Sequence, residues 1–399
     1  MRSANRKDSC QTKPTLGCNP KNHVFKKHTL SKYSILTMLL LATLVISGCQ
    51  FPGTVKGNTP VQQEFPKDYE VAVIRTSDYV EPTYIEYYDE DLNPIATTEY
   101  PYICLENMSS GPSIFDDIVY MPHRGSSIEG RNGGQVVGIS SKTGEVVEYP
   151  ATASELTATS KHIFTVRPST GGAKIGQVDK ETGESQDIAP GGYILGPLAT
   201  DGETVIIAQN SLGDEDWTLL VFSDITDIKE VKMTGLGYPG PITYTSDDKF
   251  YFSAAKLDLN TEEHTHTLNY YSLDDGQIHT FAQYTNFMSF IVENDGSLFV
   301  MQGDINVANG NEILVIDKAT EQIMSAVSIP FFPEYMKQHN GHLYLLGFYK
   351  NTGDPCLVKY RIDGSDLIYV TENKLDDGLT KSGKSAGTPY FATGMFFED

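Results

Sequence analysis

A polar turn followed by a short apolar strand recurs along most of this 399-residue chain. Aligned on residues 118, 163, 204, 250, 298, 343 and 395, the copies are 45, 41, 46, 48, 45 and 52 residues apart. A repeat of this period is one supersecondary unit, and such a unit cannot bury its apolar faces without neighbours of the same kind. The chain must therefore fold by packing a series of similar units against one another.

The other half of the repeat is a hairpin, in which two strands flank a turn rich in Asp, Lys and Gly. Its copies include residues 136–145, 175–184, 270–276, 313–318 and 359–364. These turn residues adopt positive φ easily, as tight hairpins require. Helix signals are nearly absent, and runs of Val, Ile, Tyr and Phe alternate with turn residues, which indicates an all-β protein. Four short strands per repeat is the unit of a β-propeller blade.

The repeats predict a propeller of seven four-stranded blades. Six lie in continuous sequence, near residues 111–150, 156–190, 196–232, 239–281, 287–328 and 334–371. The seventh is split: residues 389–397 match the first half of a blade and residues 84–97 the second half. Joining the two ends closes the ring without a free sheet edge. The apolar run 69–75 leaves the division of strands open. Six or eight blades, or a pair of β-sandwiches, are the alternatives.

Residues 35–46 form an apolar run that follows three lysines and ends beside Ser47, Gly48 and Cys49. A bilayer core needs about 20 such residues, whereas the apolar region of a signal peptide needs about 7–15. The run therefore predicts an export signal. A transmembrane anchor and an ordinary secretory signal with a chance cysteine are the alternatives. The region before the run is unusually long, so a later translation start is also open.

The sequence Ile46-Ser47-Gly48-Cys49 resembles the lipobox of a bacterial lipoprotein signal peptide. The resemblance implies that residues 1–48 are removed and that the Cys49 thiol carries a lipid. Residues 49–67 are polar, contain Pro and Gly and lack periodicity, which predicts a flexible tether. Residues 68–399 would then form the propeller domain. We expect an extracytoplasmic protein, lipid-anchored to a bacterial membrane at the cell surface or facing the periplasm.

The formal net charge is −22. A surface of this sign repels nucleic acid and anionic lipid, so we expect no nucleic-acid partner. It suits solubility outside the cell or a cationic partner. Beyond the lipobox, two cysteines remain, Cys104 and Cys356. Export would permit a disulfide between them, but nothing in their spacing requires one.

The pattern of an apolar strand followed by Asp-Lys-x-Thr-Gly-Glu, as at residues 175–184, resembles the broad YVTN and quinoprotein-like propeller superfamily. The resemblance covers about residues 69–399 and implies the fold. Quinone-binding members carry a tryptophan after the Thr-Gly turn of each blade. This chain has one tryptophan, Trp217, at a different position. We therefore expect no quinone, and no other cofactor is indicated.

Catalytic and metal-binding motifs are weak. The chain has no G-x-S-x-G, H-E-x-x-H or P-loop motif, so we name no catalytic residue. Residues 89–93 place oxygen-bearing side chains as a calcium loop does, but Pro94 replaces the required glycine. His264 and His266 would share one face of a strand, yet no third zinc ligand is identifiable. His339 and His342 flank a turn. We expect these to be solvated turns and loops, and no metal.

Aromatic residues mark the crossings between consecutive blades. They occur at positions 100, 102, 149, 193, 238, 284, 287, 331, 332, 390 and 391. In a propeller these crossings lie on one face, around the mouth of the channel. Tyr238, Phe287 and Phe332 come from three crossings and are our candidate ligand-binding residues, since aromatic rings can stack on sugars or grip a peptide. The alternative is that these rings pack between blades.

The sequence thus favours a membrane-tethered lipoprotein whose propeller binds a protein or a glycan. The alternatives are an exported lyase or hydrolase with its site at the channel mouth, and a scaffold in envelope assembly. Whether the chain is an enzyme stays open, although the missing motifs weigh against it. An enzyme should show ionisable groups with perturbed pKa at the channel. A binding protein should show exposed aromatic rings instead.

Overall fold

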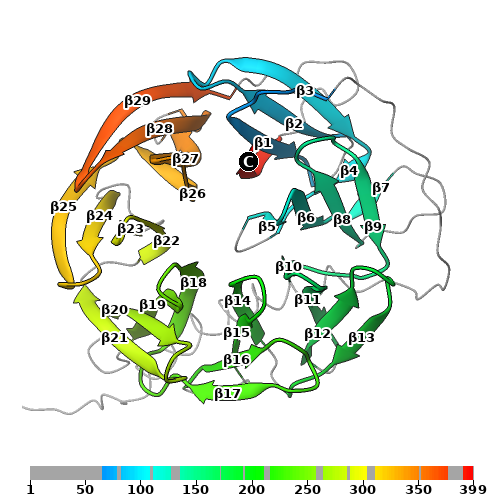
Figure 1. Ribbon diagram of the computed structural model, residues 1–399, viewed down its shortest axis with the longest axis vertical. Coiled ribbons are helices and arrows are strands. Elements are labelled where there is room, and N and C mark those ends of the chain that lie inside the picture. The colour runs from blue at the N-terminus through cyan, green and yellow to red at the C-terminus, as the bar shows by residue number, and fades with distance from the viewer. Residues whose placement is uncertain are drawn as a thin grey trace, which may run out of the picture. The chain divides into compact units, whose positions relative to one another are not determined.

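The computed structural model describes residues 65–78, 82–107, 111–126, 135–170, 172–191, 194–210, 216–257, 264–284, 288–302, 311–349, 352–375 and 390–398. These residues form seven four-stranded antiparallel sheets arranged as a ring (Figure 1). The predicted seven-bladed propeller is confirmed, and the alternatives of six blades, eight blades or two sandwiches are excluded. The predicted signal peptide and Cys49 lie outside the described residues. Among the described residues, no helix is long and apolar enough to cross a membrane.

The strands of each blade follow one another from the innermost to the outermost position. Blade 1 consists of β5 (Ser113–Phe115), β6 (Ile118–Pro122), β8 (Val136–Ser140) and β9 (Val146–Tyr149). Blade 2 consists of β10 (Glu155–Ala158), β11 (His162–Ser169), β12 (Gly172–Asp179) and β13 (Ser185–Ile188). Blade 3 consists of β14 (Ile194–Thr200), β15 (Val205–Asn210), β16 (Thr218–Phe222) and β17 (Lys229–Lys232). Blade 4 consists of β18 (Tyr238–Thr245), β19 (Lys249–Leu257), β20 (His264–Ser272) and β21 (Ile278–Tyr284). Blade 5 consists of β22 (Met288–Asn294), β23 (Ser297–Gln302), β24 (Glu312–Asp317) and β25 (Gln322–Ser328). Blade 6 consists of β26 (Phe331–His339), β27 (His342–Tyr349), β28 (Pro355–Asp363) and β29 (Asp366–Lys374).

Blade 7 joins the two ends of the domain. Its innermost strand is β30 (Phe391–Phe397), followed outward by β1 (Val71–Thr76), β2 (Thr83–Tyr88) and β3 (Pro94–Tyr100). The predicted closure by both ends is confirmed, but the C-terminal segment supplies one strand rather than half a blade. The reason is the apolar run that forms β1. Its side chains are buried throughout, and the strand takes the second position of the blade, next to β30.

The turns between third and fourth strands confirm the hairpin repeat. In blade 2 the Asp179 Oδ1 accepts hydrogen bonds from the amides of Glu181 and Thr182, at 3.0 and 2.7 Å. In blade 5 the Asp317 Oδ1 accepts one from the amide of Thr320 at 2.7 Å. The Asp side chain thus satisfies backbone donors that the sharp turn leaves without strand partners.

Tyrosine, phenylalanine and lysine side chains pack the seams between blades. Phe164 of blade 2 and Phe222 of blade 3 meet edge to face, with ring centroids 5.3 Å apart. Between blades 4 and 5, the Lys318 ammonium pairs with Asp247 at 2.5 Å and lies 5.9 Å from the centre of the Tyr251 ring. Aromatic and cation–π contacts of this kind stabilise the seams between adjacent blades.

Candidate functional site

One face of the ring carries both the crossings between blades and the loops from second to third strands, because strands alternate in direction. We call it the crossing face. The loops from second to third strands vary from two to thirteen residues, whereas those from first to second strands have two to four. Loops of variable length on a rigid scaffold are the usual location of binding residues. The crossing face is therefore the candidate ligand-binding face of the ring.

Of the two predicted ligand-binding residues that the structure describes, Tyr238 is the more exposed. It begins β18, and half of its surface (50%) is accessible to solvent. Its ring stands at 86° to that of Trp217, with the centroids 5.0 Å apart. Trp217 is itself buried. Burial of one side of the phenol and the negative charge of Glu155 raise the pKa of Tyr238, so it stays protonated. The result is an aromatic ring held in one orientation with a face open to solvent.

The other two predicted residues differ from one another. Phe332, in β26, is half-buried and stacks on Phe348 with centroids 5.3 Å apart and planes 26° apart. Tyr238 and Phe332 thus lie near the crossing-face ends of two innermost strands, in blades 4 and 6. Phe287 lies outside the described residues. Most other described aromatic residues of the crossings are buried, namely Tyr100, Tyr102, Tyr149, Phe331 and Tyr390, as inter-blade packing requires.

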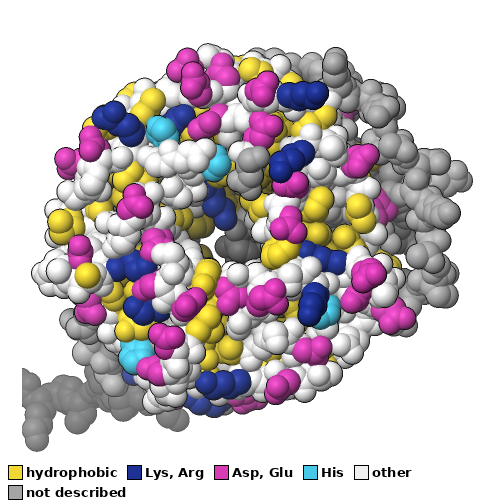
Figure 2. All heavy atoms as spheres, viewed as in Figure 1, with side chains coloured by type: hydrophobic (Ala, Val, Ile, Leu, Met, Phe, Trp, Pro, Cys, Tyr) yellow, Lys and Arg dark blue, Asp and Glu magenta, His cyan; other side chains and the backbone are white. Residues whose placement is uncertain are grey.

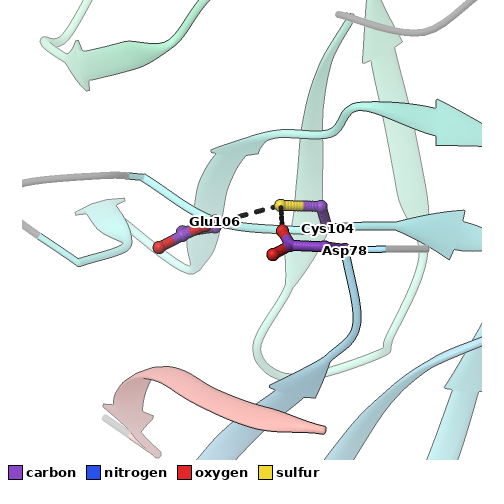
Figure 3. Close-up of side chains that lie close together, drawn as sticks. All are labelled: Asp78, Cys104 and Glu106. Atoms are coloured by element: carbon purple, nitrogen blue, oxygen red, sulfur yellow. Dashed lines mark hydrogen bonds between the residues drawn. The ribbon is translucent and has the colours of Figure 1, made fainter. Parts of the chain in front are cut away.

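The structure also gathers a cluster that the sequence did not indicate. Asp78 follows β1, while Cys104 and Glu106 follow the short strand β4 (Tyr102–Ile103) on the crossing from blade 7 to blade 1. The Cys104 Sγ lies 3.2 Å from the Asp78 Oδ1 and 3.4 Å from the Glu106 Oε2 (Figure 3). β4 pairs with β7 (Gly125–Ser126), a two-residue strand within a loop of blade 1. This small sheet holds the cluster in place.

An arginine already compensates the charge of this cluster. The Arg124 Nη1 lies 3.0 Å from the Asp78 Oδ1, and its Nη2 lies 3.8 Å from the Glu106 Oε2. Burial and the two carboxylates together raise the pKa of the Cys104 thiol, although Arg124 opposes them. The thiol is therefore a protonated donor to the carboxylates. These three ligand atoms lie within 4.8 Å of one another. A metal ion would have to remove the thiol proton and displace the guanidinium, so we assign no metal.

The other metal candidates from the sequence have ordinary structural roles where they are described. The Asp89 carboxylate accepts hydrogen bonds from the amides of Asp91 and Asn93, at 3.0 and 2.7 Å, so it stabilises the turn between β2 and β3. His339 stacks on Phe397 with centroids 4.4 Å apart. His266 is buried within β20, and the side chain of His264 lies outside the described residues.

The two cysteines of the domain do not form a disulfide. Cys104 and Cys356 are both free and buried. The structure therefore answers the question that the spacing left open.

At the channel mouth, one carboxyl group has a perturbed pKa. Glu334 lies on β26, two residues after Phe332, and its side chain is exposed at the crossing-face end of the ring. Although Glu334 is exposed by surface area, the protein atoms packed around its carboxyl group partly desolvate it, and this together with the negative charge of Glu106 raises its pKa. Glu334 was not identified from the sequence, because only ring closure brings blade 6 close to the crossing before blade 1.

No family model matches this chain, and no curated protein does. Solved structures match it in fold. A hydrazine synthase structure from Kuenenia stuttgartiensis has 11% identity and a TM-score of 0.52, covering 79% of this chain and 100% of the other. A Lactobacillus plantarum protein has 12% identity and a TM-score of 0.51, covering 83% and 100%. The β-propeller domain of the Trilobed protease from Pyrococcus furiosus has 11% identity and a TM-score of 0.52, covering 78% and 97%. At these identities the likeness concerns the fold alone.

Proposed function

We propose that this chain is an extracytoplasmic lipoprotein, tethered through Cys49, whose propeller binds a protein or glycan partner on the crossing face. The observation that carries the proposal is Tyr238: half exposed, fixed edge to face against a buried Trp217. A ring held rigidly loses little conformational entropy when a ligand stacks on it. Exposed aromatic rings that the fold does not bury are a common mark of recognition surfaces.

Two further features support this proposal. Phe332 brings a second, half-buried ring to the crossing-face end of another innermost strand. The negative charge of Glu155 acts on Tyr238, although the Glu155 side chain itself is buried. The resulting surface offers aromatic stacking beside a negative charge, which suits an uncharged or cationic ligand in a protein of net charge −22.

The test replaces Tyr238, Phe287 and Phe332 singly with Ala and measures both binding and the melting temperature. Binding is assayed on a glycan array and on purified cell-wall glycan, with partner proteins tested in parallel. Loss of one stacking contact of about 0.5–1.5 kcal/mol should weaken binding several-fold. Tyr369→Ala is the matched control, because Tyr369 is equally exposed (53%) but lies on the outermost strand β29.

The results separate binding from packing. If the Tyr238 variant binds less well and melts like the wild type, the ring is a ligand contact. If all three variants melt at much lower temperature and none binds a glycan or protein less well, these side chains pack the ring and the proposal is wrong.

Glu334 supports a second candidate, an exported hydrolase or lyase with its site at the channel mouth. Its raised pKa near Glu106 is the kind of perturbation that a general acid needs. Glu334→Gln should then abolish turnover of a glycan or peptide substrate while leaving its binding intact. Equal turnover by the wild type and this variant would remove the enzyme candidate.

A further inference from the structure

Lys337 lies on β26, an innermost strand, and its environment differs on the two sides of that strand. Its neighbour Met336 packs with Phe299 of blade 5, and Gln338 donates a hydrogen bond to Asn294 of blade 5 at 2.9 Å. Successive side chains of a strand point to opposite sides. Lys337 therefore faces the other way, toward blade 7.

His339 stacks on Phe397 of β30, whereas Tyr335 touches both sides: it packs against a cluster that includes Met395 of β30, and its ring lies 6.1 Å from that of Phe290 in blade 5. Lys337 lies between these two residues along β26 and is half-buried. The innermost strands border the central hollow of the ring, which Figure 2 shows in face view. Because β26 is an innermost strand, we take the accessible part of Lys337 to lie beside this hollow.

Lys337 has no counter-ion among the described residues. No hydrogen bond or ion pair joins its side chain to any of them. The buried Lys318 and Lys359 differ, because each pairs with a carboxylate, Asp247 and Glu70 respectively. Burial alone lowers the pKa of Lys337, with no charged neighbour contributing. An ammonium group in this position is destabilised until an anion compensates it.

We propose that Lys337 binds an oxyanion, the carboxylate or phosphate group of a small ligand, inside the central channel. This site is separate from the stacking surface at Tyr238, and the proposal does not depend on the proposed function.

The first experiment measures Lys337 in the wild-type protein. An amine-reactive acyl ester is added in sodium chloride, sodium acetate or sodium phosphate at equal ionic strength, and peptide mass spectrometry follows each lysine. We expect acetate or phosphate to slow the acylation of Lys337 at least about fivefold relative to chloride. The exposed Lys161, on the turn between β10 and β11, should react at one rate in all three salts. Protection by acetate indicates a carboxylate ligand, protection by phosphate indicates a phosphate ligand, and protection by both indicates a site that accepts either group.

The second experiment compares Lys337→Met with Lys161→Met, which loses the same charge elsewhere. Wild type and Lys161→Met should melt at higher temperature in the protecting oxyanion than in chloride, because a ligand that binds the folded state stabilises it. Lys337→Met should lose this difference. Equal acylation of Lys337 in all three salts would overturn the proposal, and so would an undiminished oxyanion effect in Lys337→Met. If Lys337→Met does not fold, the acylation result decides alone.

Discussion

The Lys359 ammonium of blade 6 lies 3.2 Å from the Glu70 carboxylate of blade 7, across 289 residues of sequence. Lys359 also donates a hydrogen bond to the carbonyl of Glu90 at 3.0 Å. Glu70 further accepts a hydrogen bond from the Tyr344 hydroxyl. Blade 7 is the blade that joins both ends of the domain, so these contacts fasten the N-terminal strands to the last continuous blade. The ring is therefore closed by charge as well as by the β1–β30 pairing.

Lys359→Met should destabilise the domain, because it leaves Glu70 without its cation at a seam where water is mostly excluded. Removing one partner of a fully buried pair costs about 3–5 kcal/mol. Glu70 retains 22% side-chain exposure, so we expect a loss of about 2 kcal/mol. Urea unfolding measures this difference. Adding Glu70→Gln should restore most of the loss, and a single variant as stable as the wild type would show that the pair contributes nothing.

Acid should unfold the domain through its paired carboxylates. Burial would raise the pKa of Asp247, but hydrogen bonds from Lys249, Lys318 and Thr245 lower it to about 2. In the unfolded chain this pKa is about 3.9. The pairing therefore stabilises the fold fully above about pH 4, and this contribution is lost as the pH falls toward 2.

The measurement is the free energy of unfolding between pH 6 and pH 2, in the wild type and in Lys318→Met. Lys318 also pairs with Glu293, whose pKa is lowered. The wild type should lose stability steeply below pH 4, and the variant, already less stable, should lose less over the same range. Parallel curves would mean that other groups control the acid transition.

Deletion of residues 388–399 should open the ring. The deletion removes β30 and leaves one edge of β1 unpaired, from Val71 to Thr76. An exposed apolar edge strand invites aggregation. We expect aggregation or a large drop in melting temperature, measured by light scattering and calorimetry. A truncated domain that melts like the intact one would show that β30 does not close the ring.

The proposed membrane tethering rests on Cys49, which lies outside the described residues. Cys49→Ala should release the protein from the membrane fraction or leave the precursor uncut, because the thiol is the proposed lipid acceptor. Radiolabelled palmitate should enter the wild type only. Palmitate in the Cys49→Ala protein would place the lipid elsewhere.

The fold could be predicted because its determinants are local and repeated. In each copy of the turn, an aspartate such as Asp179 or Asp317 accepts a hydrogen bond from a backbone amide only three residues away. The turn can therefore be recognised from the sequence alone. The order of strands in blade 7 could not be derived in the same way. Whether the run beginning at Val71 lies inside or outside depends on its pairing with β30, more than 300 residues later.

Only part of the candidate site could be predicted, because the rest depends on contacts between residues far apart in the sequence. The crossings identified Tyr238 and Phe332, but no pattern distinguished the exposed Tyr238 from the buried Tyr149, since both begin or end a strand beside a proline. The cluster of Asp78, Cys104 and Arg124 spans 46 residues. The cluster lies where β4, on the connection from blade 7 to blade 1, pairs with β7 in a loop of blade 1. That pairing has no signature in the sequence.

The most direct test of the binding proposal is site-specific photo-crosslinking in cells that make the protein. A photoreactive phenylalanine analogue is placed at position 238, at 332 or, as the control, at 369 on the outer rim. The proposal predicts that positions 238 and 332 capture the same protein or glycan and that position 369 does not. If positions 238 and 332 capture nothing, or only what position 369 captures, the crossing face is not the binding surface.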